Sequence, residues 1–292
     1  MTITLRPATP DDLPALIAIV DRAAADGEFP GHVLDDVERW RISMREVPAR
    51  TTIALREGDI AGLLCMETHD LVVAPAHRRR GVGRALVAAA IAERPAMTFY
   101  PSGHETPAAD FLRALGMVHA HSWYEMHLAP ERVVAAVDLP GSYCIRPYRL
   151  DEAEAYFALL TGSFADHPTP IEADLDLVLR VQSRPEFDPS LLGMLVDANA
   201  PDDLLGFCRC VAVPQPDGST GGEVRTLGVM PHVRRRGFGR HLLRWGVHRL
   251  RDAGCGVVTL GVIASNDKAL ALYVDEGFVS VGEHPSYAMP AS

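Results

Sequence analysis

The sequence predicts an α/β (α+β) protein of two tandem domains, each a mixed, mostly antiparallel sheet flanked by helices. Its 292 residues suffice for two domains of ordinary size. The stretch at 71–86 returns without a gap at 227–242, and strand-like and helix-like segments alternate through the second half. A proline- and glycine-bearing stretch at 138–142 marks the junction, which gives domains 1–138 and 139–292.

Both copies of the repeat are expected to begin with a short strand that leads into a capped helix. LRPATPDDLPAL at 5–16 corresponds to IRPYRLDEAEAY at 145–156. In the first copy, Thr9 has the position and chemistry of a helix cap. In the second copy, Asp151 and Glu154 have the spacing of a capping box.

The remainder of the second copy predicts three more strands, two helices and a hairpin. Apolar runs at 191–198 and 204–213 flank a turn-rich stretch, which is typical of a β-hairpin. The segments that follow are a strand at 223–231, an amphipathic helix that Gly254 ends, a buried strand at 255–264, a helix that Gly277 ends and a closing strand at 278–290.

The composition is that of a globular protein, with 48% hydrophobic residues, 23% charged residues and a formal net charge of −10. This balance argues against nucleic-acid and membrane-surface binding, since both favour a broad basic face. No apolar run reaches the ~20 residues that a membrane span needs, and the N-terminus lacks a signal pattern. The five cysteines form no CxxC pair, which predicts a cytoplasmic protein without a structural metal.

The most informative segment is HVRRRGFGRHLL at 232–243, where a strand ends and a helix begins. A helix start leaves backbone N–H groups unpaired, and glycines let an anion approach them. The arginines add positive charge, so the segment predicts a phosphate cradle. It is neither a P-loop nor a dinucleotide fingerprint, because the GK[ST] and GxGxxG spacings are missing. The alternative is a solvated, arginine-rich helix start, but the in-register copy at 71–86 favours phosphate.

The pattern V-x-P-x-x-R-x-x-G-x-G, followed by an apolar helix, resembles the acetyl-CoA-binding motif of the GNAT acetyltransferases. The resemblance extends over nearly the whole chain and implies acetyl-CoA as co-substrate. It further implies that loop N–H groups hold the pyrophosphate, that the strand end at 227–229 pairs with the pantetheine arm, and that the N–H of Val229 polarises the thioester carbonyl. The residues it assigns to the coenzyme are Leu227, Gly228, Val229, Arg234, Arg235, Arg236, Gly237, Phe238, Gly239, Arg240 and Asn266, and in the first copy Leu71, Val72, Val73, Arg78, Arg79, Arg80, Gly81, Val82, Gly83 and Arg84.

The catalytic candidates lie in the second copy. The spacing N-x-x-A-x-x-x-Y-x-x-x-G-F at 266–278 matches the C-terminal motif of the same family, which implies that Tyr273 is the general acid and Asn266 a coenzyme contact. Glu223 stands where many GNAT enzymes carry a carboxylate that takes the amine proton through water. The alternatives are an aromatic side chain packed on a helix face for Tyr273 and a solvated strand-end carboxylate for Glu223.

The first copy departs from this pattern. Leu112 stands where Tyr273 does, and Glu105 where Asn266 does. A leucine cannot give a proton, so the N-terminal domain is predicted to be non-catalytic. Tyr100 or Tyr124 remains an alternative donor in that copy.

Among tandem GNAT proteins, the second half is most similar to the mycothiol synthases, which acetylate a cysteinyl amino-sugar. Three positions depart from that subfamily: Thr169 replaces a glutamate, Val211 a lysine and Gly261 a tyrosine. The sequence therefore predicts an acetyl-CoA-dependent N-acetyltransferase that acts on a primary amine of a small molecule through its C-terminal domain. The alternatives are a mycothiol synthase proper, a non-catalytic acyl-CoA sensor and an enzyme that acetylates protein N-termini or lysines. The identity of the amine stays open, as does the choice between monomer and homodimer.

Overall fold

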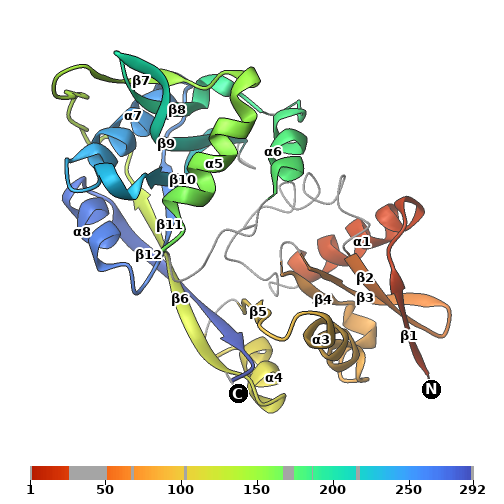
Figure 1. Cartoon of the computed structure of the whole chain (residues 1–292). Coiled ribbons are helices and arrows are strands. Elements are labelled where there is room, and N and C mark those ends of the chain that lie inside the picture. Colours follow the sequence, from red (N-terminus) through yellow and green to blue (C-terminus); the bar gives the residue numbers. More distant parts are fainter. Residues whose placement is uncertain are drawn as a thin grey trace. The chain divides into compact units, whose positions relative to one another are not determined.

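The computed structural model describes residues 2–25, 51–66, 69–101, 104–166, 174–185, 187–214 and 218–290. The chain divides into two compact units (Figure 1). The first comprises Met1–Tyr124, Ile263–Ser265 and Gly282–Ser292, and the second comprises Glu125–Val262 and Asn266–Val281. The predicted junction at 138–142 lies between β6 (Val118–Leu128) and β7 (Tyr143–Pro147). Because the first unit also contains segments from the C-terminal end of the chain, the units differ from the two copies of the repeat. The boundaries 1–138 and 139–292 stay a prediction.

The first unit contains a four-stranded antiparallel sheet in the order β1-β2-β3-β4. Ile53 and Leu63 belong to the core cluster of α1, whereas their neighbours Ala54 and Leu64 belong to that of α3, so the helices cover opposite faces. The elements are β1 (Ile3–Pro7), η1 (Pro10–Asp12), α1 (Leu13–Ala25), β2 (Thr51–Arg56), β3 (Asp59–Cys65), β4 (Leu71–Val73), η3 (Pro75–His77), α3 (Val82–Glu93), β5 (Thr98–Phe99) and α4 (Pro107–Ala114).

The second sheet has eight strands in the order β5-β12-β6-β11-β10-β9-β8-β7. The pairs from β7 to β10 are antiparallel and β10–β11 is parallel, which confirms the predicted mixed sheet. The elements are β6 (Val118–Leu128), β7 (Tyr143–Pro147), η4 (Leu150–Glu152), α5 (Ala153–Ser163), α6 (Leu175–Gln182), η5 (Pro189–Leu191), β8 (Leu192–Asp197), β9 (Ala200–Pro214), β10 (Thr220–Val229), η6 (Pro231–Val233), α7 (Phe238–Asp252), β11 (Val258–Ile263), α8 (Asp267–Asp275) and β12 (Val279–Ala288).

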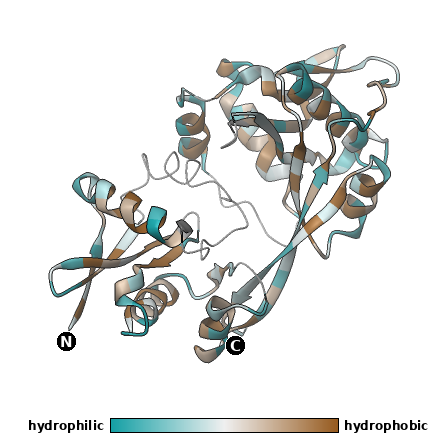
Figure 2. Cartoon of the chain, turned by 180° about the vertical axis from the view of Figure 1, so that it is seen from behind, coloured by the Kyte–Doolittle hydropathy of each residue, from teal (hydrophilic) through white to brown (hydrophobic). Residues whose placement is uncertain are grey.

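The predicted hairpin, the helix that Gly254 ends, the helix that Gly277 ends and the closing strand are all confirmed. Both glycines have a positive φ, 82° and 97°, as expected where a helix stops. Helix α7 mixes hydrophobic and hydrophilic residues along its length (Figure 2). It buries Leu242, Val247 and Leu250, which confirms that it is amphipathic.

The two copies enter their first helices through the same ion pair. Arg6 donates two hydrogen bonds of 2.7 and 2.8 Å to Asp12, and this pairing holds the pKa of Asp12 well below its usual range. The backbone N–H of Thr9 also donates to Asp12, at 2.8 Å, which confirms the predicted cap. In the second copy, Arg146 donates to Glu152 at 2.7 and 2.8 Å.

The predicted capping box of Asp151 and Glu154 is wrong. The capping residue is Arg149, whose backbone N–H donates to Glu152 at 2.8 Å. The reason is that a short 3-10 turn, η4, precedes α5 and moves the cap toward the N-terminus. Glu152 is therefore the counterpart of Asp12, since each carboxylate pairs with an arginine and accepts from the N–H of the capping residue.

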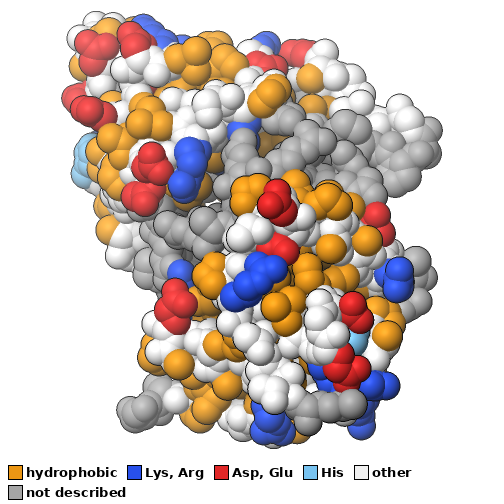
Figure 3. All heavy atoms as spheres, turned by 90° about the vertical axis from the view of Figure 1, so that its right-hand side faces the viewer, with side chains coloured by type: hydrophobic (Ala, Val, Ile, Leu, Met, Phe, Trp, Pro, Cys, Tyr) orange, Lys and Arg blue, Asp and Glu red, His pale blue; other side chains and the backbone are white. Residues whose placement is uncertain are grey.

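On the face that Figure 3 draws, acidic and basic side chains are interspersed and no broad basic area is seen. Among the helices of the described residues, none combines the length and apolar character that crossing a bilayer requires.

Close packing between β8 and α7 generates a stability prediction. A Cβ atom at Gly193 would lie 2.6 Å from Cζ3 of Trp245, so Gly193→Ala must displace the indole ring. We expect a loss of about 1–3 kcal/mol in the free energy of unfolding, measured by urea denaturation. Gly256→Ala is the control, because its nearest neighbour would be 3.9 Å away. Equal stability of the two variants would contradict this packing.

Candidate functional site

The site begins where β10 separates from β11. Their parallel pairing covers Gly222, Glu223 and Val224, opposite Val258, Thr259 and Leu260. On its other edge β10 stays paired with β9 as far as Val229. The strand end Leu227–Val229 therefore has one edge without a strand partner among the described residues. Such an edge can hydrogen-bond to an extended ligand as an added strand would.

A β-bulge accounts for this separation. The register of β10 against β9 shifts between Val224 and Thr226, which leaves Arg225 as the extra residue. Gly228 has a packing role beyond the bulge, because a Cβ atom there would lie 2.5 Å from Oγ of Ser163 on α5. The absence of a side chain at Gly228 lets α5 approach the strand end.

The arginine–glycine turn has an unusual backbone that recurs in both copies. Arg235 and Gly237 have φ values of +65° and +80°, and their counterparts Arg79 and Gly81 have values of +60° and +86°. A non-glycine residue in this region is uncommon and is often found at ligand-binding turns. The same strained turn therefore precedes α3 and α7.

This turn presents a row of open backbone donors. In the described part of the chain, the N–H groups from Arg235 to Gly239 donate to no carbonyl group. Arg235, Arg236 and Gly237 are exposed. A Cβ atom at Gly237 would find its nearest neighbour, His241, at 4.0 Å, so the turn is open to a ligand. Five consecutive N–H groups at a helix N-terminus form an anion-binding surface.

The four predicted arginines divide into two groups. Arg234 is engaged with protein: it donates to Asp166 at 2.5 and 2.9 Å, to the carbonyl oxygen of Ser163 at 2.9 Å and to that of Val229 at 3.0 Å. Arg240 pairs with Asp275 at 3.0 Å and with Glu276 at 2.6 Å. Arg236 donates only to the hydroxyl of Tyr143, at 3.1 Å, among the described residues. Arg235 and Arg236 are thus the guanidinium groups best able to reach an anion.

The first copy repeats this division. Arg78 donates from Nε to the carbonyl oxygen of Val73 at 3.3 Å, as Arg234 does to that of Val229. The exposed members of the first turn are Arg79, Arg80, Gly81 and Arg84, whereas Val82 is buried like its counterpart Phe238. The remaining assigned residues of the first copy, Leu71, Val72 and Gly83, are partly or fully buried.

Glu276 holds the start of α7 against the end of α8. Its side chain is 6% exposed and accepts hydrogen bonds from Arg240 and from Arg244, the latter at 2.8 Å. Burial alone would raise the pKa of Glu276, but these two guanidinium groups outweigh it and the pKa lies below its ordinary value.

The two residues of the C-terminal motif lie on α8. Asn266 caps the helix and its side-chain oxygen accepts from the N–H of Ala269 at 3.2 Å. Tyr273 is buried, and its ring centroid lies 6.1 Å from that of Phe278. Burial raises the pKa of Tyr273 above its usual value, and the nearby Cys208 thiol adds to the shift. The phenol is therefore protonated at neutral pH, as a proton donor must be.

Glu223 and Tyr273 belong to opposite faces of the sheet. The flanking residues Gly222 and Val224 face α7, and strand alternation turns Glu223 to the face of α5. Tyr273 lies on α8, which packs beside α7, since Arg240 and Arg244 of α7 pair with Glu276 at the end of α8. A carboxylate and a phenol thus flank the end of β10–β11 pairing from two sides.

Glu223 is partly buried at its position on β10. Its side chain is 19% exposed and accepts a hydrogen bond of 2.8 Å from Arg225, the residue of the bulge.

The first copy places different side chains at the equivalent points. Leu112 is buried in the core at the position of Tyr273. The N-cap of α4 is Thr106, whose side-chain oxygen accepts a hydrogen bond of 3.2 Å from the N–H of Ala109. The structural counterpart of Asn266, the N-cap of α8, is therefore Thr106 and not the predicted Glu105. Phe111 lies 3.1 Å from a Cβ atom at Gly83, which makes this start of α3 more crowded than that of α7.

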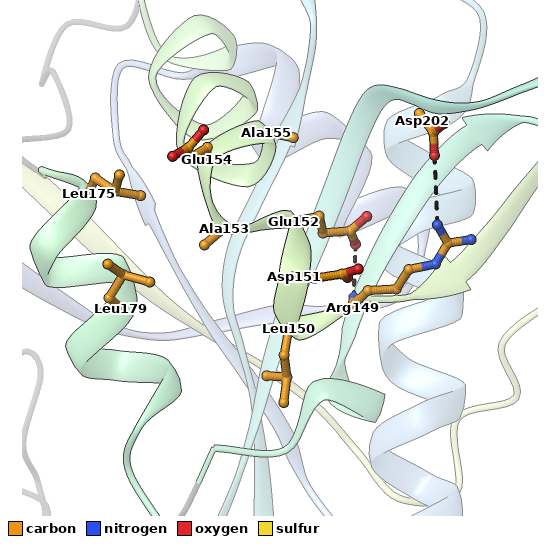
Figure 4. A pocket seen from close by; sticks show the side chains of 10 residues that line it. All are labelled: Arg149, Leu150, Asp151, Glu152, Ala153, Glu154, Ala155, Leu175, Leu179 and Asp202. Carbon is orange, nitrogen blue, oxygen red and sulfur yellow. Dashed lines mark hydrogen bonds and ion pairs between the residues drawn. The ribbon is translucent and has the colours of Figure 1, made fainter.

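A cavity of about 550 Å³ lies at the start of α5 (Figure 4). Its lining includes Arg149, which pairs with Asp202 at 3.7 Å, together with Asp151, Glu154 and Leu179. None of the predicted site residues lines this cavity. Thr169, one of the three departures noted in the sequence, lies outside the described residues.

The chain matches two models of one family. Residues 153–278 match the acetyltransferase (GNAT) family model, and residues 48–125 match the acetyltransferase (GNAT) domain model. The tandem arrangement predicted from the repeat is thereby confirmed.

Several curated relatives carry the name mycothiol acetyltransferase. The protein of Thermobispora bispora is 32% identical over 281 residues, which cover 92% of this chain and 93% of that protein. The protein of Beutenbergia cavernae is 33% identical over 231 residues, 76% of each chain.

Solved structures share the fold at low identity. A GCN5-related N-acetyltransferase from Sphaerobacter thermophilus has a TM-score of 0.66 at 19% identity and covers 98% of this chain and 94% of its own. A tandem GNAT protein from the clavulanic acid biosynthesis pathway has a TM-score of 0.66 at 17% identity and covers all of both chains.

The Glu276 cluster predicts how stability depends on pH. Because the pKa of Glu276 is lower in the folded state than in the unfolded chain, its contribution is complete above the unfolded value of about 4.3 and is lost as the pH falls through the lower, folded value. We expect Glu276→Gln to be less stable than the wild type at pH 7 and to lose less stability on acidification, in urea denaturation at a series of pH values. Glu154→Gln, at an exposed site on α5, is the control. Parallel pH profiles for the wild type and Glu276→Gln would contradict this account.

Proposed function

This chain belongs to the GNAT family of N-acetyltransferases, and from that premise we propose that its C-terminal copy transfers an acetyl group from acetyl-CoA to a primary amine of a small molecule. Two neighbouring features carry the proposal: the free strand edge at Leu227–Val229 and the five open N–H groups from Arg235 to Gly239, with only Met230, η6 and Arg234 between them. The open N–H groups can bind a diphosphate, and the free strand edge can hydrogen-bond to an extended chain that carries amide groups.

The coenzyme would be held mainly by backbone. The N–H groups of the turn bind the diphosphate, and Arg235 and Arg236 add charge from its exposed side. In this proposal Arg234 and Arg240 act through their ion pairs, by fixing the turn against α5 and α8. Phe238 and Gly239 begin α7 and leave room for the ligand, and Asn266 supports the site as the cap of α8.

Bound acetyl-CoA supplies an activated acetyl thioester. Glu223 accepts the proton that the amine loses, through water, while the N–H of Val229 donates a hydrogen bond to the carbonyl oxygen. Tyr273 gives its proton to the departing sulfur. Glu223 has then gained one proton and Tyr273 has lost one, and exchange with water restores both side chains for the next turnover. The protonated phenol of Tyr273 donates a hydrogen bond to the sulfur as the C–S bond breaks, and its proton follows onto the thiolate.

The N-terminal copy is proposed to bind acetyl-CoA without turnover. Its turn has the same backbone, but Leu112 replaces the proton donor. The hydroxyl of Tyr100 accepts a hydrogen bond of 3.0 Å from Thr98, and Tyr100 follows β5 rather than lying on α4 with Leu112, which argues against its serving as the donor.

The relatives named mycothiol acetyltransferase make mycothiol synthesis the first specific alternative. Val211 and Gly261 leave the acceptor side without the lysine and tyrosine expected in that subfamily, which favours a different amine. A non-catalytic acyl-CoA sensor is the second alternative, and it is favoured by the loss of the donor in the first copy.

Coenzyme binding is tested by Gly237→Ala, which adds a methyl group beside the open N–H groups. We expect the Kd for acetyl-CoA, measured by calorimetry, to rise by about tenfold or more, which corresponds to ~1.4 kcal/mol. Gly254→Ala is a matched control, since Gly254 has nearly the same φ, 82° against 80°, at the other end of α7. Equal Kd values for the two variants would refute the cradle, and Gly81→Ala tests the first copy in the same way.

Catalysis is tested by Tyr273→Phe, which removes only the hydroxyl group. We expect kcat for thiol release to fall by roughly 10²–10⁴-fold while the Kd for acetyl-CoA stays the same. Tyr100→Phe should leave turnover as it is. Full activity in Tyr273→Phe on every amine that the wild type accepts would remove Tyr273 from the reaction.

A further inference from the structure

A second charged residue lies on the Glu223 face of the sheet. On β9, Phe207 packs against Tyr156 of α5, whereas Cys208 and Cys210 face α7. Strand alternation therefore places Arg209 on the face of α5. Val211, two residues further, shares that face and is the register partner of Glu223.

Arg209 is partly buried and yet has no hydrogen-bond or ion-pair partner among the described residues. No guanidinium nitrogen of Arg209 is among the fully buried side-chain polar atoms that lack a partner, so this group keeps donors open to solvent and to a ligand. Other arginines of this unit have partners: Arg225 pairs with Glu223, and Arg234 with Asp166. Arg209 therefore differs from Arg225 and Arg234 in having no protein partner among the described residues, and it lies on the same face of the sheet as Glu223.

Tyr156 provides a second donor at the same place. Its ring is buried between those of Tyr148 and Phe207, with centroids 5.4 and 5.3 Å away. Burial raises the pKa of Tyr156 to about 12, and the positive charge of Arg209 opposes part of this shift. The ring of Tyr156 packs on Phe207, which lies two residues before Arg209 on the same face of β9. In the described ranges the hydroxyl of Tyr156 forms no hydrogen bond, and it is not among the fully buried unpaired polar atoms, so it is open to a ligand.

We propose that Arg209, with the hydroxyl of Tyr156, binds an anionic group of the amine acceptor, so that the preferred substrate carries both a primary amine and a carboxylate or phosphate. This inference rests on the proposed function, since it takes Glu223 as the group that receives the amine proton. Arg209 is the register partner of Leu192 on β8 and of Thr226 on β10, and Val211 is the register partner of Glu223. Along β9, Arg209 lies two residues, or roughly 7 Å, from Val211, the register partner of Glu223, and a small acceptor can bridge this spacing.

The experiment compares matched pairs of acceptors that differ only in the anion: an amino acid with its amide, and an amino-sugar phosphate with the free amino-sugar. Thiol release from acetyl-CoA gives kcat/KM for each member. We expect the anionic member of at least one pair to be preferred by ~10- to 100-fold, which is the range of a charge-assisted hydrogen bond. The pair that shows the preference identifies carboxylate or phosphate.

Variants assign the preference to Arg209. Arg209→Gln should bring the ratio within each pair close to one, chiefly through KM, and Arg209→Lys should retain part of it. Arg180→Gln, on the surface of α6, is the control and should leave the ratio unchanged. Thermal unfolding of each variant establishes that it is folded. A wild type without preference, or a preference that survives Arg209→Gln, would overturn the inference.

Binding is measured separately, so that the two proposals can fail independently. Calorimetry with the same pairs, in the presence of coenzyme A, should show tighter binding of the anionic member and its loss in Arg209→Gln. If that selectivity is found but no amine is acetylated, the proposed function fails and the anion site stands. Binding of neither member, or of both alike, overturns the anion site.

Discussion

The separation of β10 from β11 is the constraint on which the rest of the site depends. A single extra residue at Arg225 shifts the register against β9, and parallel pairing with β11 ends at Val224. A strand that stayed paired on both edges would have no N–H or C=O group left for a ligand. The bulge residue also donates to Glu223, so one local irregularity opens the edge and orients the carboxylate beside it.

The two copies show how one backbone can carry different functions. Both turns have positive φ at an arginine and at a glycine, and both helices begin directly after that glycine. What differs is the side chain that α4 or α8 brings to the strand end, Leu112 in one copy and Tyr273 in the other. Backbone geometry that binds a coenzyme can therefore persist in a copy that lacks the side chain for proton transfer.

Local patterns in the sequence predicted the hairpin, the helix ends at Gly254 and Gly277 and the open turn, because each depends on residues close together in the chain. The roles of Arg234 and Arg240 could not be predicted in this way. Their partners Asp166 and Glu276 are distant in sequence, and only the fold brings them together. The cap at Arg149 was missed for a local reason, since the pattern did not reveal the 3-10 turn before α5. Arg209 gave no signal, because its lack of a partner is a property of the folded sheet.

A crystal structure of the protein with acetyl-CoA tests the central claim most directly. The account predicts diphosphate oxygens within hydrogen-bond distance of N–H groups between Arg235 and Gly239, with the pantetheine amides paired to Leu227–Val229. A diphosphate held elsewhere, or a pantetheine arm that leaves this strand edge unpaired, would contradict it.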